Sequence, residues 1–387
     1  MAQLPVRLCG NAWIALNPLT TLNQSREMFD QAVVTKLKRE TNDSVAVTLS
    51  LSHSVTDKYD YKQGQNLTLI QEFDGTEVRR SYSICASVND AELRVGIKKI
   101  PDGLFSSWAN EELKVGDVVN LLPPAGHFFT ELDANRQGNY LGVAAGSGIT
   151  PILSILKTTL ETEPHSYFTL LYGNKRIDSI MFLEDIEALK NKYPERFRVF
   201  NILSQEMQNA ELLNGRIDAT KMDSFLNTLV NAENLDEAFL CGPFEMVMSA
   251  QQALLEHGMQ QANVHTELFG TPSDLKAIES AQNERALSKE ELAHTSEVTV
   301  VIDGKGSKLH LKRGGDSILD AALKIRSDLP FACKGGVCAT CKAKIIEGQV
   351  EMDVNYSLSP QEIEQGFVLS CQSHPISDKV IIDFDQK

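Results

Sequence analysis

The first part of the chain carries short runs in which apolar and polar residues alternate. Six such runs, rich in β-branched side chains, lie between Phe29 and Pro123, and turn-forming pairs such as Asp74-Gly75 separate them. Alternation is typical of half-buried strands, and several short strands at regular spacing indicate a barrel. The runs are 32–35, 45–49, 66–70, 80–84, 93–97 and 118–122. We therefore predict an antiparallel β-barrel over residues 28–130.

A different rhythm begins at Asn139, where apolar strand-like runs alternate with segments of helical period. The expected strands are 140–144, 168–172, 198–203, 238–241 and 264–269, and the expected helices are 152–160, 181–192, about 220–230 and 244–257. Strand–helix alternation predicts a parallel sheet with helices on both faces. Residues 131–270 are therefore expected to form an α/β domain of the nucleotide-binding type.

The end of the chain shows a third pattern. A hairpin over 298–311, a helix over 317–326 and strands over 344–346 and 380–382 predict a mixed sheet crossed by one helix, an α+β unit over 297–387. Residues 271–296 are polar and indicate a linker with some helical tendency around 274–293. Residues 1–27 have no clear period and are expected to be an N-terminal extension.

Four cysteines of the last unit carry the clearest chemical signal. Cys333, Cys338, Cys341 and Cys371 are separated by four, two and 29 residues, the spacing of plant-type [2Fe–2S] ferredoxins. Structural zinc usually takes paired C-x2-C knuckles, and disulfides suit small secreted domains. Gly335 and Gly336 would let the loop turn its N–H groups toward the sulfurs. We predict that the four thiolates bind a [2Fe–2S] cluster.

Composition narrows the class of protein. The chain has 387 residues, 42% apolar and 23% charged, as in soluble globular proteins, and its net charge of −15 argues against a nucleic-acid partner. No apolar run approaches membrane-spanning length, and the N-terminus lacks the layout of a secretory signal. We expect a cytoplasmic protein with reduced thiols and with neither membrane nor nucleic acid among its partners.

Two further motifs suggest cofactor binding, although each has an ordinary alternative. Residues 146–151, Gly-Ser-Gly-Ile-Thr-Pro, join a predicted strand to a predicted helix, where a pyrophosphate could approach the backbone. A tight packing turn explains the same glycines equally well. Arg80 can pair with a diphosphate and Tyr82 offers a ring to a flat cofactor, whereas a solvated strand charge and a packing residue are the simpler explanations.

Taken in order, the motifs resemble those of a known family. Arg-x-Tyr-Ser at 80–83, Gly-x-Gly-x-x-Pro at 146–151 and Cys-Gly-Pro at 241–243 resemble the ferredoxin–NADP⁺ reductase superfamily over about residues 28–270. The C-terminal 90 residues resemble a plant-type ferredoxin. This domain order occurs in several oxygenase reductases, and the chain is most similar to the reductase subunits of phenylacetyl-CoA 1,2-epoxidase complexes.

The resemblance implies a role for each matching position. FAD would be held by Arg80, Tyr82, Ser83, Val95, Ile97, Lys98, Gly103, Ser106 and Ser107, with Ser83 near the reactive nitrogen of the flavin. The pyridine nucleotide would be held by Gly146, Gly148, Thr150 and Pro151, with Cys241, Gly242 and Pro243 facing the nicotinamide. Ser83 and Cys241 would be the catalytic residues. Phe269 is either the aromatic residue over the flavin or an ordinary core phenylalanine.

The nucleotide's 2′-phosphate has three candidate partners. Lys175 and Arg176 follow the second predicted α/β strand and Ser204 follows the third, while Asp178 lies close by. Basic groups there favour NADPH over NADH, although NADH stays possible.

The expected function is electron transfer from NAD(P)H through FAD and the [2Fe–2S] cluster. The resemblance implies that the acceptor is an oxygenase component, the diiron phenylacetyl-CoA epoxidase of phenylacetate degradation. A Rieske or steroid oxygenase, or the hybrid cluster protein, is an alternative acceptor, and a redox sensor is an alternative function. Lys334, Val337 and Ala339 lie between the cluster ligands and are candidates for the surface through which electrons leave.

Overall fold

The computed structural model describes residues 29–52, 55–269, 295–302, 304–326 and 329–386. The predicted extension over 1–27 and the helical tendency over 274–293 lie outside these residues. None of the helices within the described ranges is long and apolar enough to cross a membrane.

The first domain is a six-stranded antiparallel barrel. Its strands are β1 (Asp30–Thr41), β2 (Ser44–Leu51), β3 (Asn66–Phe73), β4 (Thr76–Ser83), β5 (Leu93–Lys98) and β6 (Val118–Leu121), in the order β4-β3-β6-β1-β2-β5. An isolated bridge between Ile84 and Val95 joins the two edge strands and closes the barrel. All six predicted strands are present. Helix α1 (Leu104–Glu111), which alternation could not reveal, packs Phe105 and Trp108 against Phe73.

The second domain is a five-stranded parallel sheet between two helical layers. The strands are β7 (Asn139–Ala145), β8 (Tyr167–Asn174), β9 (Phe197–Leu203), β10 (Glu237–Gly242) and β11 (Val264–Leu268), in the order β11-β10-β7-β8-β9. Helices α2 (Ile149–Thr162) and α3 (Leu183–Lys192) share one apolar core with the sheet, and α4 (Ala219–Thr228) and α5 (Phe244–Glu256) share another. Because both faces are covered, the three inner strands β10, β7 and β8 are almost continuously buried. The predicted α/β arrangement is confirmed.

The third domain is a mixed sheet crossed by one helix. The main sheet has the order β13-β12-β18-β14-β16, and β15 pairs with β17 in a second, two-stranded sheet. Their bounds are β12 (Thr295–Ile302), β13 (Lys305–Lys312), β14 (Lys342–Glu347), β15 (Val350–Met352), β16 (Phe367–Leu369), β17 (Ser373–Pro375) and β18 (Lys379–Asp383). Helix α7 (Ile318–Leu323) is shorter than the predicted 317–326, and α8 (Pro360–Glu364) was not predicted. Elements of three to five residues are too short to show a period.

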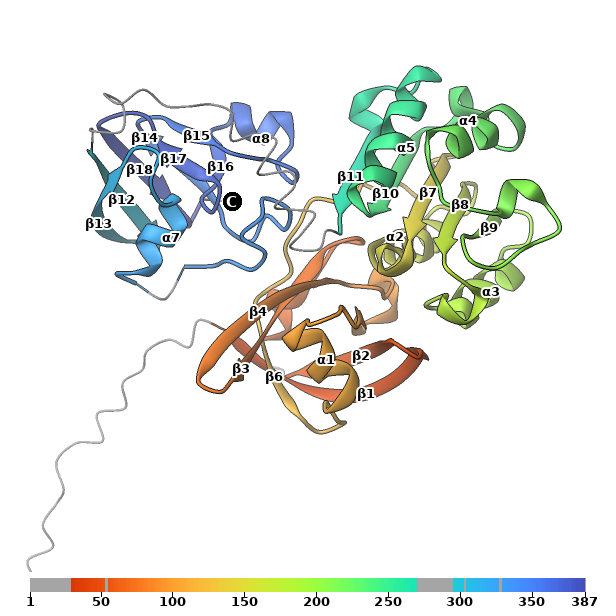
Figure 1. Cartoon of the computed structure of the whole chain (residues 1–387), viewed down its shortest axis with the longest axis horizontal. Helices are drawn as coiled ribbons and strands as arrows, with labels where there is room; N and C mark the ends of the chain where they lie inside the picture. The colour runs from red at the N-terminus through yellow and green to blue at the C-terminus, as the bar shows by residue number, and fades with distance from the viewer. Residues whose placement is uncertain (1–28, 53–54, 270–294, 303, 327–328, 387) are drawn as a thin grey trace, which may run out of the picture.

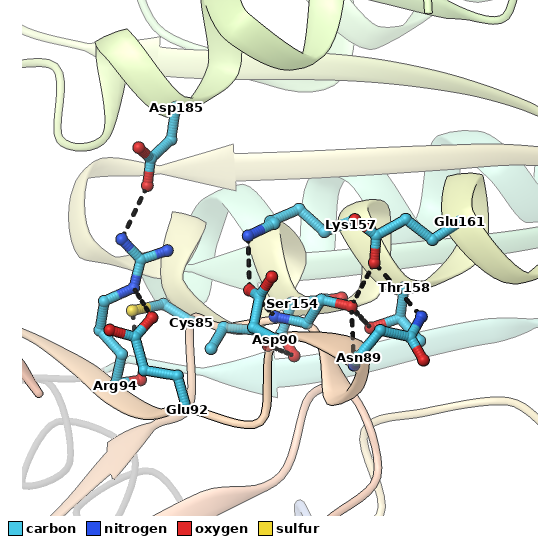
Figure 2. A network of polar contacts seen from close by, with 12 residues as sticks. Cys85, Asn89, Asp90, Glu92, Arg94, Ser154, Lys157, Thr158, Glu161 and Asp185 are labelled. Carbon is cyan, nitrogen blue, oxygen red and sulfur yellow. Dashed lines mark hydrogen bonds and ion pairs between the residues drawn. The ribbon is translucent and has the colours of Figure 1, made fainter. Parts of the chain in front are cut away.

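A polar network joins the barrel to helix α2 (Figure 2). Ser154 Oγ donates to the carbonyl of Ala86 at 2.6 Å, and Ser87 Oγ donates to Glu161 at 2.6 Å. Lys157 pairs with Asp90 at 2.6 Å. Figure 1 shows the result: the carboxyl ends of the parallel strands face the barrel, with the blue C-terminal domain beside both.

Candidate active site and cluster loop

Three side chains meet where the barrel abuts the parallel sheet. Ser83 ends β4, Cys241 lies near the carboxyl end of β10, and Glu267 lies on the neighbouring strand β11. Ser83 Oγ donates to Glu267 Oε2 at 3.4 Å, and Cys241 Sγ donates to the same oxygen at 3.9 Å. The two residues predicted to be catalytic therefore come together through a carboxyl group that links two domains.

Glu267 is missing from the sequence-based candidates, yet it has an unusual environment. Glu267 is half-buried, and desolvation of its carboxyl group raises the pKa to about 8; the hydrogen bonds from Ser83 and Cys241 only partly oppose that shift. The raised pKa favours the protonated form at neutral pH. Burial also raises the pKa of the Cys241 thiol well above its ordinary value, so the thiol stays neutral. Little in the sequence signalled it, because β11 also carries His265 and Thr266, so an acid there does not stand out.

The residues predicted to hold the flavin lie on β4, β5 and α1, but they differ in what they can offer. Arg80 is exposed and donates to its neighbour's carbonyl oxygen at 2.7 Å, so its charge can meet a ligand. Tyr82 is partly buried, with its ring 5.6 Å from that of Phe105. Val95 and Ile97 are fully buried in the barrel core, so only their backbone could face a cofactor.

The other predicted flavin positions form the entry to α1 and the end of β5. Gly103 is the N-cap residue of α1, and Ser106 Oγ donates to its carbonyl oxygen at 3.2 Å and accepts from the N–H of Ile100 at 3.1 Å. Ser107 follows, partly buried, in the first turn of the helix. Lys98 pairs with Asp43 at 3.5 Å. The free N–H groups of a helix start suit a diphosphate.

The glycine-rich turn lies between β7 and α2. Gly146 has φ +54°, a left-handed conformation, and a Cβ on Gly148 would lie 2.2 Å from the carbonyl oxygen of Cys241. Gly148 therefore lets this turn pack directly against the Cys241-Gly242-Pro243 turn. Thr150 and Pro151 are buried in the first turn of α2. Ligands of parallel sheets bind at the carboxyl ends of the strands, which is where both turns lie.

The candidates for the 2′-phosphate lie together at the ends of β8 and β9. The backbone N–H of Ser204 donates to Asn174 at 2.9 Å, and that of Gln205 donates to Lys175 at 2.8 Å. Lys175 and Arg176 are exposed, but Arg176 already pairs with Asp178 at 3.5 Å.

Phe269 follows β11 and lies beside the Cys-Gly-Pro turn. Its backbone N–H donates to the carbonyl oxygen of Gly242 at 2.9 Å. Its ring packs against the core of the α/β domain and is partly exposed.

The four predicted cluster ligands lie in two facing pairs. Cys333 faces Cys338, and Cys341 faces Cys371. A hydrogen bond from Cys333 lowers the pKa of Cys338, and a hydrogen bond from Cys341 lowers the pKa of Cys371. The N–H of Gly335 donates to Cys333 Sγ at 3.3 Å. Positive φ angles occur at Lys334, Gly336 and Ala339. The loop thus turns at non-glycine residues as well as at Gly336.

The donor set fits a two-iron cluster better than a single ion. In the part of the chain that the structure describes, no group of three His, Cys, Asp or Glu residues is placed to hold one metal ion. Four sulfur donors spread over two pairs suit a cluster, because each iron then takes two thiolates.

Sequence-family profiles match each domain separately. Residues 31–130 match the oxidoreductase FAD-binding domain, residues 143–252 the oxidoreductase NAD-binding domain, and residues 300–375 the 2Fe-2S iron-sulfur cluster binding domain.

Known proteins resemble the chain over nearly its whole length. One of the subunits of the 1,2-phenylacetyl-CoA epoxidase of Escherichia coli K12 is 44% identical over 93% of this chain and 98% of its own. The ferredoxin reductase component of the 3-ketosteroid-9-alpha-monooxygenase of Rhodococcus rhodochrous is 34% identical over 91% of this chain and 95% of its own. The solved structure of phthalate dioxygenase reductase is 19% identical with a TM-score of 0.54, over 92% of this chain and 98% of that one, and shares the fold. The chain therefore belongs to the ferredoxin–NADP⁺ reductase superfamily, in the group fused to a C-terminal plant-type ferredoxin, and is an electron-transfer oxidoreductase that uses FAD, a pyridine nucleotide and a [2Fe–2S] cluster.

Proposed function

We propose that this oxidoreductase passes electrons from NADPH, through FAD and the [2Fe–2S] cluster, to an oxygenase component. A flavin accepts a hydride and releases electrons singly, which a one-electron cluster requires. The observation that carries the proposal is the meeting of Ser83, Cys241 and Glu267, because it joins the predicted flavin and nicotinamide positions. The cluster loop adjoins the barrel on the same side, because Thr340 Oγ1 lies 3.5 Å from Thr68 Oγ1, and Thr68 pairs with Ser81 on β4.

The site residues take the following roles in the proposal. Ser83 Oγ and Glu267 Oε2 form a short path for a proton at the flavin, and buried Cys241 excludes water beside the nicotinamide. Arg80 and the start of α1 bind the diphosphate of FAD, and the turn over 146–151 binds that of the nucleotide. Cys333, Cys338, Cys341 and Cys371 hold the cluster. We assign 28–130 to FAD and 131–270 to the nucleotide. We begin the cluster domain at 295 and not at the predicted 297, because β12 starts at Thr295. Residues 271–294 are then the linker.

The partner we propose is a phenylacetyl-CoA epoxidase, a diiron oxygenase acting on an aromatic CoA thioester. The support is the 44% identity to a component of such an enzyme across almost the whole chain. A steroid oxygenase is the second candidate, favoured by the 34% identity to a ketosteroid monooxygenase component. NADPH oxidation would be measured with the oxygenase subunits of the epoxidase and phenylacetyl-CoA, and with ketosteroid oxygenase and its steroid. Oxidation of NADPH with formation of the epoxide in the epoxidase mixture alone supports the proposal. Oxidation with formation of hydroxylated steroid in the ketosteroid mixture alone overturns it.

We propose NADPH as the coenzyme, with Lys175, Arg176 and Ser204 around its 2′-phosphate. Removing a cation from a phosphate site weakens charge-assisted hydrogen bonds that NADH does not make. Arg176→Gln should therefore raise KM for NADPH about tenfold and leave KM for NADH unchanged. Equal effects on both coenzymes would contradict this assignment. We further propose a cytoplasmic location, since four thiols must stay reduced to bind iron.

A further inference from the structure

The C-terminal domain contacts both other domains through the side that carries the cluster loop. Thr340 Oγ1 lies 3.5 Å from Thr68 Oγ1 of the barrel. Val337 and Tyr356 pack against the α4–α5 side of the α/β domain, where the rings of Tyr356 and Phe244 are 6.4 Å apart. Figure 1 shows this domain lying beside both β4 and β11. The cluster loop therefore contacts both of the other domains.

Arg79 forms one anchor of this contact. Its side chain is only 3% exposed, its Nε pairs with Glu77 at 2.7 Å, and its guanidinium lies over the ring of Phe331 at 4.5 Å. It also donates to the carbonyl oxygen of Leu329 at 3.4 Å. Phe331 precedes the first cluster ligand by two residues, and alternation along β4 directs Arg79 and Arg80 to opposite faces. Strand β4 therefore contacts the segment before the cluster loop through Arg79, while Arg80 points to the predicted flavin site.

His127 forms a second anchor, on the segment that leads from the barrel to the α/β domain. Its Nε2 lies 3.1 Å from Glu362 Oε1 and 3.3 Å from Lys342 Nζ. Lys342 and Glu362 pair with each other at 3.0 Å within the C-terminal domain. Lys342 directly follows the ligand Cys341. The two anchors therefore lie at opposite ends of the cluster loop, one before Cys333 and one after Cys341.

We propose that Arg79 and His127 are positioning residues that dock the ferredoxin domain in the orientation in which its cluster accepts electrons from the flavin. The inference rests on the proposed electron path. In this orientation Val337 packs against the α/β domain and Ala339 is buried in the core of its own domain. Of the three residues expected to form the surface through which electrons leave, only Lys334 is exposed. The exit surface expected at Val337 and Ala339 is therefore corrected to the Lys334 side, because the other residues contact the reductase domains or the protein core.

The test uses the full-length protein with both cofactors bound, as Arg79→Met, His127→Ala and the double variant. Lys379→Met is the matched control, since it removes an exposed ion pair of 2.8 Å with Glu347 inside the ferredoxin domain. Rapid mixing with NADPH separates flavin reduction from cluster reduction, and hydrogen–deuterium exchange over 329–342 reports docking. In the double variant we expect flavin reduction within about twofold of wild type, cluster reduction slowed by about tenfold or more, and faster exchange over 329–342.

Three results would overturn the inference: an unchanged rate of cluster reduction in the double variant, the same loss in Lys379→Met, or an equal loss in flavin reduction. A different result separates the inference from the proposed function. If NADPH reduced the flavin of the wild type but never its cluster, the proposed path would fail, and exchange over 329–342 would then decide the docking: faster exchange in the double variant supports it, and unchanged exchange rejects it.

Discussion

At the scale of single residues, the environment of Glu267 gives the site its chemistry. The Glu267 side chain is half-buried beside Ser83 and Cys241, and desolvation of its carboxyl group favours the neutral form. A protonated acid next to a hydroxyl group can give or take a proton without opening the site to water. The sequence could not reveal this environment of Glu267, because its hydrogen-bond partners Cys241 and Ser83 lie 26 and 184 residues away along the chain.

Glu267→Gln tests this protonation state. The pKa of Glu267 is raised in the folded protein, so its contribution to stability is present below about pH 4.5 and is lost as pH rises toward 8. Glutamine mimics the neutral acid. We expect equal thermal unfolding midpoints for wild type and variant at about pH 4, and a higher midpoint for the variant above about pH 8. Parallel midpoint curves across that range would show that Glu267 is ionised throughout.

At the scale of elements, helix α2 serves both of the first two domains. Its N-terminus faces the predicted nucleotide site, while Ser154 and Thr158 in its middle turns hydrogen-bond to the barrel segment after β4 (Figure 2). The long elements could be predicted because their apolar period repeats several times. Helix α1 and the short strands β15 to β17 could not be predicted, because segments of three to eight residues are too short for an apolar period to repeat.

Ser154→Ala removes a buried hydrogen bond across this contact. The carbonyl of Ala86 loses its 2.6 Å donor, and leaving a buried polar group without a partner costs about 1–3 kcal/mol. We expect a lower thermal unfolding midpoint for the variant. The control is Ser224→Ala on α4, where the hydroxyl bonds only to its own helix at the carbonyl of Thr220, and its midpoint should barely change. Equal shifts in both variants would contradict the role given to this contact.

Gly148→Ala should separate nucleotide binding from flavin binding. The added Cβ would lie 2.2 Å from the carbonyl oxygen of Cys241, so the turn at 146–151 must move away from the Cys-Gly-Pro turn. Because the barrel is untouched, the purified variant should keep its FAD while its KM for NADPH rises by about tenfold or more. Absorbance of the bound flavin and steady-state kinetics measure the two effects. Loss of FAD with an unchanged KM would refute the assignment.

At the scale of the whole molecule, three domains with separate cores meet at one place. Each domain could be predicted from its own pattern: alternation for the barrel, strand–helix repetition for the α/β unit, and cysteine spacing for the cluster loop. Their meeting could not, because the contacts of Arg79 with Phe331 and of His127 with Glu362 join residues with no shared local pattern. The arrangement indicates the direction of electron transfer in the proposed path: the cluster loop contacts the barrel on one side, and Lys334 is exposed to a partner.

The most direct measurement is an anaerobic reaction with NADPH, followed by visible absorbance and by electron paramagnetic resonance, in wild type and Cys338→Ser. In wild type we predict loss of flavin absorbance and then the signal of a reduced [2Fe–2S] cluster. In Cys338→Ser, flavin reduction should persist while reduction of the oxygenase partner collapses, because a thiolate ligand is missing. Oxygenase turnover at the wild-type rate in Cys338→Ser, or a wild type whose cluster stays oxidised, would contradict the proposed path.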